Sequence, residues 1–455
     1  MSRKDYIVVG AGPAGLTSAW LLAKCGKSVT VIESAQEIGG CHRVIRHDGK
    51  FSEHGPRVYS SAYKTLARLL NDMGVQFNDI FTPYKFKMSS IGGRTVSNMH
   101  FSEIFQLTSA YIQHMLGRDY TKISMREFTK NFTPNTIDYI DRLCILTDGS
   151  KIDDYSVDKF LNLMNQQVAL YDLYQPRTPN DLGLFKIWRK SLEDLGVEIL
   201  TNTKVNSLII ENNTVYGAKT DVGDFYGNNV ILAIPPKPLY ELLKEHNVIS
   251  KSWVDNNSYI DYITINYEWN KKISSVWGFP ATKWGVAHIV LSDYFGGDRT
   301  LISAGITKVD VPNDEGITAR NATPEQLIKE VLKQLRESYD LPEPDSAIIG
   351  SRIGQENAYV RNTKDPSFLP FQLGVKNLYN VGTQNGKSQY VYTSMESAVV
   401  NAHALVHELE PFSKKYPIID AWTLNWVLVV VLLVVLLVSS VYFYKKKITL
   451  QILTV

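Results

Sequence analysis

The fold of this chain is decided by Tyr6-Ile7-Val8-Val9-Gly10-Ala11-Gly12-Pro13-Ala14-Gly15, close to its N-terminus. The apolar start of this stretch enters a G-x-G-x-x-G turn, and a helical stretch follows as far as Lys24. A second apolar run, Val29–Ile32, ends at the acid Glu33. Strand, turn, helix, strand and acid in this order predict a βαβ unit that binds a dinucleotide.

Each small residue of the turn has a predicted role. Gly10 permits the tight bend, Gly12 lets a diphosphate approach the backbone, and Gly15 lets helix and strand pack closely. The N–H groups at the start of the helix are free to hold the phosphates, and we expect Glu33 to accept hydrogen bonds from the ribose. The predicted cofactor contacts of this unit are Gly10, Gly12, Pro13, Ala14, Gly15 and Glu33.

Composition excludes several classes of protein. The 455 residues carry a formal net charge of +2, without a basic cluster or zinc-finger spacing, so the sequence predicts no nucleic-acid partner. Three cysteines without a C-x-x-C pair argue against a disulfide framework. His403 and His407 lie one helical turn apart but lack the H-E-x-x-H pattern, so no metal site is predicted.

The C-terminal region predicts a membrane anchor. Trp422 to Tyr444 contains no charged residue and is long enough to span a bilayer as a helix, with Trp and Tyr at both ends. The nucleotide motif begins so early that we expect no secretory signal before it. Together these features predict a single-pass, tail-anchored protein with its catalytic domain in the cytosol, on the endoplasmic reticulum, the outer mitochondrial membrane or a viral membrane.

The order of elements predicts an α/β fold with a discontinuous Rossmann-like domain. Val205 to Val222 alternates like a β-meander around Asn212-Asn213, and Val230–Ile234 has the apolar character of a buried parallel strand. The predicted nucleotide domain comprises 1–80, 181–247 and 350–410. The inserts 81–180 and 248–349 form a mixed α+β substrate domain, followed by a linker (411–421), a transmembrane helix (422–444) and a tail (445–455).

Four further motifs follow the first turn. They are the glycine pair Gly39-Gly40, the step Gly55-Pro56-Arg57-Val58, the stretch Asn202-Thr203-Lys204-Val205, and Gly382 followed later by Met395-Glu396-Ser397-Ala398. In this order they resemble the flavin-containing amine oxidase superfamily, which includes phytoene desaturases and protoporphyrinogen oxidase. The resemblance covers most of the chain before residue 411.

This resemblance implies FAD rather than NAD as the cofactor. It places a backbone contact to adenine at Val205 and the N-terminus of the last helix against the flavin, where the helix dipole stabilises negative charge on the ring. The further cofactor contacts it implies are Gly40, Pro56, Arg57, Val58, Val205, Gly382 and Met395. The chain also departs from the pattern: Cys41-His42 replace the usual arginine, so Arg43 is expected to take over its phosphate contact.

Other departures bear on the chemistry. Ser394 replaces a tyrosine of animal monoamine oxidases, and Asp261 occupies the expected position of a lysine on a substrate-domain strand. Because no cysteine follows Cys144, the cysteinyl link of those enzymes cannot form, and we expect FAD to bind non-covalently. His54-Gly55-Pro56-Arg57 and Ser388–Tyr392 are also similar to motifs of UDP-galactopyranose mutase, in which reduced flavin attacks a sugar.

The leading functional hypothesis is an FAD-dependent oxidoreductase that takes hydride from a substrate C–H or C–N bond. Its substrate is a small molecule, which the anchor suggests is lipophilic, and its electron acceptor is oxygen or another compound. His54 and Arg57 are predicted beside the flavin, with a solvated loop as the alternative; Tyr390 and Tyr392 are predicted to frame the substrate, with ordinary packing as the alternative. The rival functions are a mutase and a non-catalytic flavin-binding membrane protein.

Overall fold

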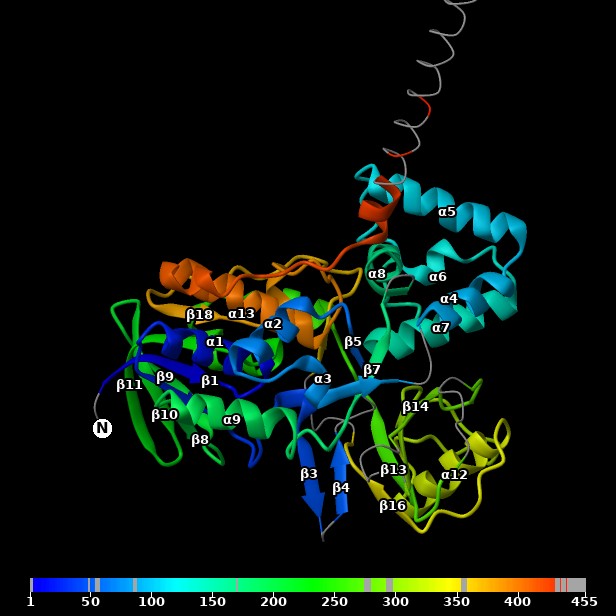
Figure 1. The fold of residues 1–455 in the computed structure, drawn as a ribbon, viewed down its shortest axis with the longest axis horizontal. Helices are drawn as coiled ribbons and strands as arrows, with labels where there is room; N and C mark the ends of the chain where they lie inside the picture. The colour runs from blue at the N-terminus through cyan, green and yellow to red at the C-terminus, as the bar shows by residue number, and fades with distance from the viewer. Residues whose placement is uncertain are drawn as a thin grey trace, which may run out of the picture.

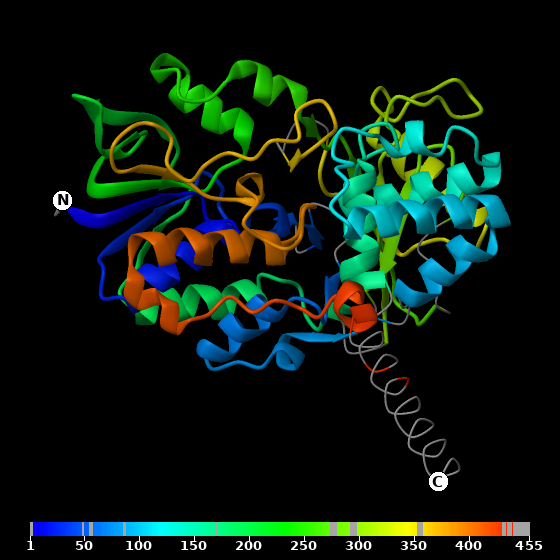
Figure 2. The same cartoon turned by 90° about the horizontal axis from the view of Figure 1, so that it is seen from above.

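The computed structural model describes residues 3–47, 50–53, 58–84, 88–168, 171–273, 280–291, 298–352, 358–429, 434 and 439. A seven-stranded sheet with its covering helices occupies one end of the molecule in Figure 1. A helical cluster and a four-stranded sheet occupy the other end. Figure 2 shows the same two ends from above.

The large sheet contains strands from three distant parts of the chain. Its order is β8-β2-β1-β11-β10-β9, with β18 paired to β11. The strands β8, β2, β1, β11 and β18 run parallel, and β9 and β10 form an antiparallel meander on β11, as predicted. The bounds are β1 Lys4–Val9, β2 Val29–Ile32, β8 Glu198–Leu200, β9 Val205–Glu211, β10 Thr214–Thr220, β11 Gly223–Leu232 and β18 Leu378–Asn380.

The meander closes through the turn that the sequence indicated. Asn212 and Asn213 have φ values of 46° and 57°, which asparagine tolerates better than most residues. Two successive residues of positive φ form the type of turn whose twist matches that of its flanking strands. The pairing of Thr214 with Glu211 follows directly from this turn.

Helices cover the large sheet and bury its apolar strands. α1 packs against α13 and α9, and the indole Nε1 of Trp20 donates to Ser191 Oγ at 2.9 Å. Most of α13 is buried because it packs against α1, α2 and the turn at Pro411–Lys415. The bounds are α1 Pro13–Lys24, α2 Lys64–Asp72, α3 Phe77–Ile80, α9 Leu184–Asp194, α10 Pro236–Leu243, α11 Lys251–Asn256 and α13 Met395–Leu409.

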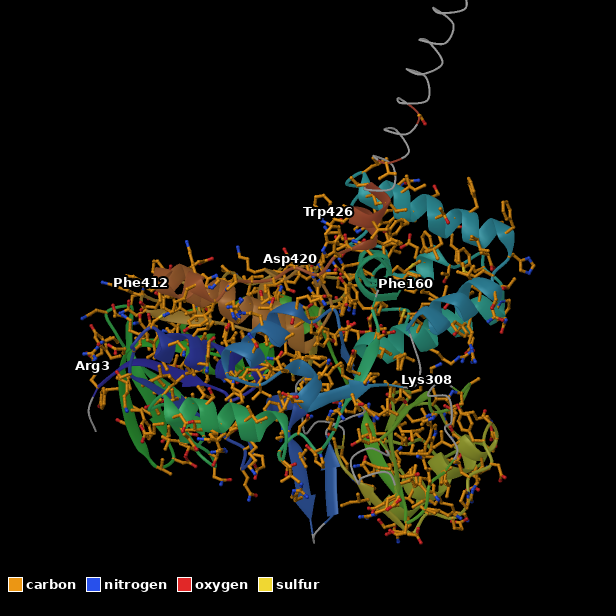
Figure 3. The ribbon with its side chains drawn as sticks, in the orientation of Figure 1. Arg3, Phe160, Lys308, Phe412, Asp420 and Trp426 are labelled. Atoms are coloured by element: carbon orange, nitrogen blue, oxygen red, sulfur yellow. The ribbon has the colours of Figure 1, made fainter. Side chains whose placement is uncertain are left out.

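The first insert, residues 81–180, is mostly helical. Its core includes Phe160, which lies inside the cluster in Figure 3. Glu103 joins two helices, because its carboxylate accepts from His100 N and from Thr136 Oγ1, each within 2.9 Å. The helices are α4 Met88–Ser97, α5 Phe101–Met115, α6 Met125–Phe128, α7 Pro134–Asp148 and α8 Val157–Leu163, beside a small sheet of β5 Tyr59–Ser60, β7 Leu173–Pro176 and β6 Phe81–Pro83.

The second insert forms an antiparallel sheet of order β14-β15-β13-β16 with α12 on one face. Its other face carries Ile289, Leu291 and Leu301, which pack on Val44 of β3. Lys308 Nζ lies 2.8 Å from Asp141, which ties this insert to α7 (Figure 3). The bounds are β3 Val44–His47, β4 Lys50–Glu53, β12 Ser258–Tyr259, β13 Ile263–Trp269, β14 Val286–Val290, β15 Thr300–Ile306, α12 Pro324–Arg336, β16 Ser346–Ile349 and β17 Tyr359–Val360.

The segment after α13, predicted as a short linker, is held along its length. Thr65 Oγ1 donates to Ile419 O at 3.1 Å and accepts from Ile419 N at 3.2 Å. Tyr171 Oη donates to Trp422 O at 2.9 Å. Figure 2 shows this segment crossing from α13 to the helical cluster. We call residues 411–425 the C-terminal strap.

The predicted tail anchor requires a correction. Residues 424–429 are helical, but most of the predicted span after them lies outside the described residues. Within the part of the chain that the structure describes, no helix combines the length and the apolar character needed to cross a bilayer. The start of the predicted span also contacts the protein, since Asn425 N donates to Asn165 Oδ1 at 2.9 Å. These findings contradict the single-pass, tail-anchored localisation.

Candidate functional site

The candidate site lies at the carboxyl edge of the large sheet. Register places Val9, Leu232 and Asn380 side by side at the ends of β1, β11 and β18. Because these strands are parallel, the loops that follow them leave the sheet at the same edge. The loops that begin at Gly10 and at Val381 are therefore neighbours, although they lie far apart in the sequence.

The first loop has room only for glycine at two positions. Gly10 has a φ of +101°, and a Cβ there would lie 2.5 Å from Ala233 O. A Cβ on Gly15 would collide with Gly10 O. These contacts bring the first turn of α1 close to the ends of β1 and β11, as the motif predicts.

Gly12 and Gly40 form a bare backbone surface beside this turn. A Cβ on Gly40 would lie 3.0 Å from Gly12 Cα, so the two chains approach closely. Gly12 is the N-cap of α1 and supplies no side-chain cap. The first amides of α1 therefore face a surface without side chains, which fits the diphosphate of a dinucleotide. Arg43 Nη1 donates to Gly40 O at 3.0 Å and so braces the glycine pair.

Glu33 organises the turn through its carboxylate, and its contact with the ribose stays a prediction. Its Oε2 accepts from Ala11 N at 2.7 Å, and its Oε1 accepts from Ala35 N at 2.8 Å. Its backbone O accepts from Thr203 N at 2.9 Å, two residues before Val205. The structure thus brings Glu33 and the predicted adenine-side segment together.

Amide side chains fix the loop of the third segment. Gln384 Nε2 donates to Ile234 O at 3.4 Å, and Gly382 N donates to Asn385 Oδ1 at 2.8 Å. The side chain of Ile234 lies 3.0 Å from the position of a Cβ on Gly10. Ile234 therefore connects the Gly10 turn to the Gly382 loop, and all three segments meet at one edge.

The N-terminus of α13 points toward the same edge. At its other end, Glu410 accepts from Tyr6 Oη at 2.7 Å and lies 3.1 Å from Lys27 Nζ, near the start of β1 and the end of α1. α13 therefore runs parallel to α1, with Met395 at the end where Gly12 lies. Ser394 caps the helix because its Oγ accepts from Ser397 N at 3.0 Å.

Glu396 is a site residue to which the sequence assigned no role. Its two carboxylate oxygens accept from Thr65 N at 2.7 Å and from Leu66 N at 2.9 Å, in the first turn of α2. Burial raises the pKa of this carboxyl to about 7, although the two amide donors oppose the rise. The signals in the sequence are its place in the Met395-Glu396-Ser397-Ala398 motif and the occurrence of an acid in the first turn of an otherwise largely apolar helix.

The predicted substrate tyrosines lie in the core of the helical cluster. Tyr390 is 1% exposed, and its hydroxyl donates to Ala62 O at 2.9 Å. Its ring centroid lies 5.6 Å from that of Tyr392, edge to face. Packing accounts for these contacts, and a role for either ring at the substrate stays a prediction. His54, Pro56 and Arg57 lie outside the described residues, and Val58, just after them, packs against the small apolar cluster that includes Val44.

Two other candidates from the sequence, Asp261 and the pair His403 and His407, have partners away from the sheet edge. Asp261, expected on a strand, lies between β12 and β13, where its carboxylate is 3.1 Å from Arg320 Nη2. His407 Nε2 lies 3.0 Å from Tyr416 O, and the His403 and His407 rings meet edge to face. Among the residues that the structure describes, no group of three or more His, Cys, Asp and Glu side chains is arranged to hold a metal ion.

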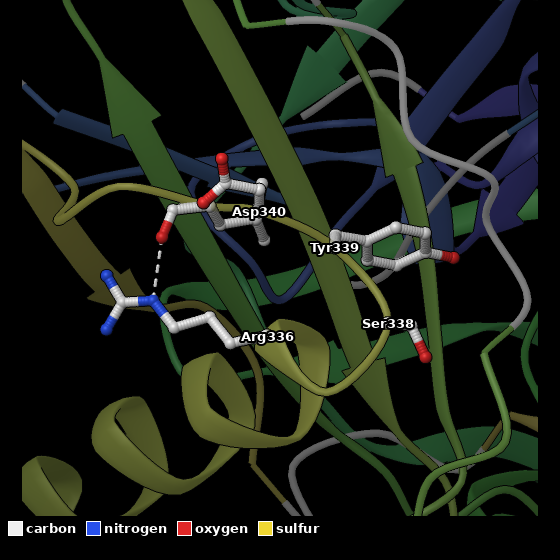
Figure 4. Close-up of a pocket in the computed structure, with 5 residues that line it drawn as sticks. Arg336, Ser338, Tyr339 and Asp340 are labelled. Atoms are coloured by element: carbon white, nitrogen blue, oxygen red, sulfur yellow. Dashed lines mark hydrogen bonds between the residues drawn. The ribbon is translucent and has the colours of Figure 1, made fainter.

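A surface hollow lies away from this edge, at the end of α12 (Figure 4). It is formed where the chain reverses after the helix, and Arg336 Nε donates to Leu341 O at 2.7 Å across the reversal. Arg336 Nη1 also lies 2.7 Å from Glu343. The Arg336 guanidinium is held by the loop that follows α12, so these contacts account for the hollow without a ligand. Its lining residues are Arg336, Ser338, Tyr339, Asp340 and Leu341.

Comparison with known proteins agrees with the nucleotide-binding geometry. A family model described as an NAD(P)-binding Rossmann-like domain matches residues 8–73. The L-amino acid oxidase Cdc18 of Crotalus durissus cumanensis is 33% identical over 78 residues, which make up 17% of this chain and 16% of that protein. The match therefore spans less than a fifth of the length of either protein.

Solved structures extend the similarity to most of the fold. Cyclohexylamine oxidase from Brevibacterium oxydans aligns over 90% of this chain and 100% of its own, with a TM-score of 0.64 and 13% identity. Wild-type putrescine oxidase aligns over 90% of this chain and 99% of its own, with a TM-score of 0.61 and 15% identity. At such identity the likeness establishes the fold. The comparisons confirm the resemblance to the flavin-containing amine oxidase superfamily that the motifs predicted, and they support FAD as the cofactor.

Proposed function

We propose that this chain is an FAD-dependent oxidoreductase of the amine oxidase type. The observation that carries the proposal is the meeting of the Gly12, Gly40 and Gly382 loops at one sheet edge, beside the N-terminus of α13. A Rossmann turn alone would suit many nucleotides. The return of a C-terminal segment to the same edge is the feature shared with the superfamily.

The residues of the chain have distinct proposed tasks. The first amides of α1 bind the diphosphate, and Glu33 holds Ala11 N so that the turn keeps its shape. The N-terminus of α13 favours negative charge near the flavin. Bound at this edge, FAD would supply the redox chemistry, namely hydride acceptance from the substrate and electron transfer to oxygen. Since no cysteine follows Cys144, we propose that the cofactor is bound without the cysteinyl link of monoamine oxidases.

We also propose that different segments of the chain bind the cofactor and the substrate. The segments 1–80, 181–247 and 350–410 form the FAD-binding unit, and the inserts 81–180 and 248–349 form the substrate unit. In support, the large sheet takes strands from all three segments of the first group. His54 and Arg57 are proposed to lie beside the flavin, and Tyr390 and Tyr392 are proposed on the substrate side.

The proposed substrate is a small primary amine. The similar proteins include an L-amino acid oxidase, a putrescine oxidase and a cyclohexylamine oxidase. The test is to purify the full chain and mix it anaerobically with L-leucine, putrescine and cyclohexylamine. Bleaching of the flavin by one of them, with hydrogen peroxide formed on admission of air, supports the proposal. If none of these or a wider amine panel reduces the flavin, while reduced protein converts UDP-galactose, the mutase is favoured instead.

A further inference from the structure

Two helix N-termini, those of α2 and α13, meet at one buried carboxylate. α1 and α13 both begin at the edge where the Gly10 and Gly382 loops meet, as their parallel packing requires. The first turn of α2 joins them, because Thr65 N and Leu66 N donate to Glu396. Glu396 is 1% exposed and occupies the first turn of α13 itself.

A carboxylate in this position has an electrostatic effect beyond its hydrogen bonds. The N-terminus of a helix carries about half of a positive charge, which stabilises nearby anions. A carboxylate between two such ends offsets part of that positive potential, and the effect extends further in a buried site than in water. It therefore opposes the gain of negative charge by any group at the end of α13.

We propose that Glu396 is a positioning residue that holds the start of α13 at the flavin and lowers the reduction potential of bound FAD. This inference rests on the proposed function, since it requires FAD at the sheet edge. Glu396 would act on the flavin without touching it, because its charge changes the electrostatic potential at the end of α13 that faces the flavin. The same carboxylate links α13 to α2 and, through Thr65, to the C-terminal strap.

Among the residues that the structure describes, few charged groups face Glu396 from the elements around it. Asp420 of the strap is the nearby acid, and Tyr390 contributes a buried phenol from the segment before α13. Burial raises the pKa of the Tyr390 hydroxyl, so it stays neutral near pH 7. Lys64 of α2 instead lies over the Tyr171 ring, 5.3 Å from its centroid. Glu396 is therefore the buried group whose charge changes with pH at this junction.

The test compares Glu396→Gln with Glu410→Gln in the full FAD-bound protein. Both substitutions replace a hydrogen-bonded acid by its amide, at opposite ends of α13, which are about 20 Å apart at 1.5 Å per residue. The midpoint potential of the bound FAD is measured for each variant at pH 8.5 and pH 5.5. At pH 8.5, where Glu396 is ionised, the expected result is a positive shift in E396Q and none in E410Q. At pH 5.5 both variants match wild type.

Glu396→Met is measured in parallel, because it removes the charge without placing an amide donor beside Leu66 N. Equal potentials in wild type, E396Q and E396M at pH 8.5 overturn the proposal and leave Glu396 a purely structural role. Loss of FAD from both Glu396 variants, while E410Q retains it, overturns the effect on the potential and leaves Glu396 a residue that only holds the site together. If the wild-type protein binds no FAD, that result counts against the proposed function itself.

Discussion

Asp148 of α7 and Lys159 of α8 form an ion pair that is sealed from solvent, with their side chains 0% and 1% exposed. Both side chains also form hydrogen bonds with residues outside these two helices. Asp148 Oδ1 accepts from Thr393 N at 3.2 Å, and Lys159 Nζ donates to Arg361 O at 3.0 Å. Thr393 directly precedes the N-cap of α13, so this buried pair fixes the approach of the chain to the candidate site.

A double-mutant cycle measures the coupling in this pair. Removing one partner leaves the other charge buried and uncompensated, which costs about 3–5 kcal/mol. We expect Asp148→Asn and Lys159→Met each to lower the free energy of unfolding by that amount in urea titrations. The double variant is expected to lose less than the sum of the two. Additive losses would show that the two side chains stabilise the fold independently.

Glu396 makes stability depend on pH. Its pKa is about 7 in the folded protein, against 4.5 for the ordinary carboxyl, so the folded state binds the proton more tightly. Its contribution to stability is therefore complete below pH 4.5 and is lost as pH rises to 7. At about 1.4 kcal/mol per pKa unit, the loss is about 3 kcal/mol.

Urea unfolding of wild type and Glu396→Gln across this range checks the prediction. The wild-type free energy of unfolding should fall between pH 4.5 and pH 7 relative to that of the variant, and then run parallel to it. A difference between the two proteins that stays constant from pH 4.5 to pH 8 would mean that Glu396 ionises normally.

Gly12 should matter for the cofactor but not for folding. A Cβ there would meet only Gly40 Cα, at 3.8 Å, which is an ordinary contact. We expect Gly12→Ala to keep the unfolding free energy within about 0.5 kcal/mol of wild type. The methyl group would stand where the diphosphate approaches, so the Kd for FAD should rise by about 100-fold, equivalent to about 3 kcal/mol.

Gly93→Ala is the matched control. Gly93 lies inside α4, and a Cβ there meets nothing within 4 Å. Alanine should stabilise this helix by about 0.5–1 kcal/mol and leave FAD binding unchanged. Equal Kd values for the Gly12 and Gly93 variants would place the diphosphate away from the first turn of α1.

The C-terminal strap should open more readily when its contact with Tyr111 of α5 is removed. Tyr111 Oη donates to Asn425 Oδ1 at 2.5 Å, and Asn165 Oδ1 accepts from Asn425 N. Losing one such hydrogen bond costs about 1 kcal/mol, or about a fivefold change in an opening equilibrium. Tyr111→Phe should therefore speed hydrogen exchange at residues 416–426 about fivefold and leave exchange in α1 unchanged. Equal acceleration in both regions would indicate global destabilisation.

The local sequence pattern predicted the strands and the turn of the large sheet. β2 matches the predicted Val29–Ile32 without change, and β11 and β18 lie beside β1 as the predicted parallel sheet requires. The turn at Asn212-Asn213 was also predictable, because its chemistry is local. In each of these segments, hydrophobic period and turn residues act within a few positions of one another.

Contacts between distant segments could not be predicted in this way. Glu396 finds its donors at Thr65 and Leu66, on a helix more than 300 positions earlier. The strap has the prolines and lysines of a linker, but its backbone is held by tertiary partners such as Thr65. Asp261 was assigned to a strand by alignment, whereas its pairing with Arg320 depends on a loop of the second insert.

The proposed chemistry depends most on FAD binding at the edge where the Gly12 and Gly382 loops meet. The most direct measurement is a titration of the cofactor-free full chain with FAD and, separately, with NAD, followed by flavin fluorescence and by calorimetry. We expect saturable binding of one FAD per chain and weaker or no binding of NAD. Absence of saturable FAD binding, or tighter binding of NAD, would contradict the assignment of this edge to FAD.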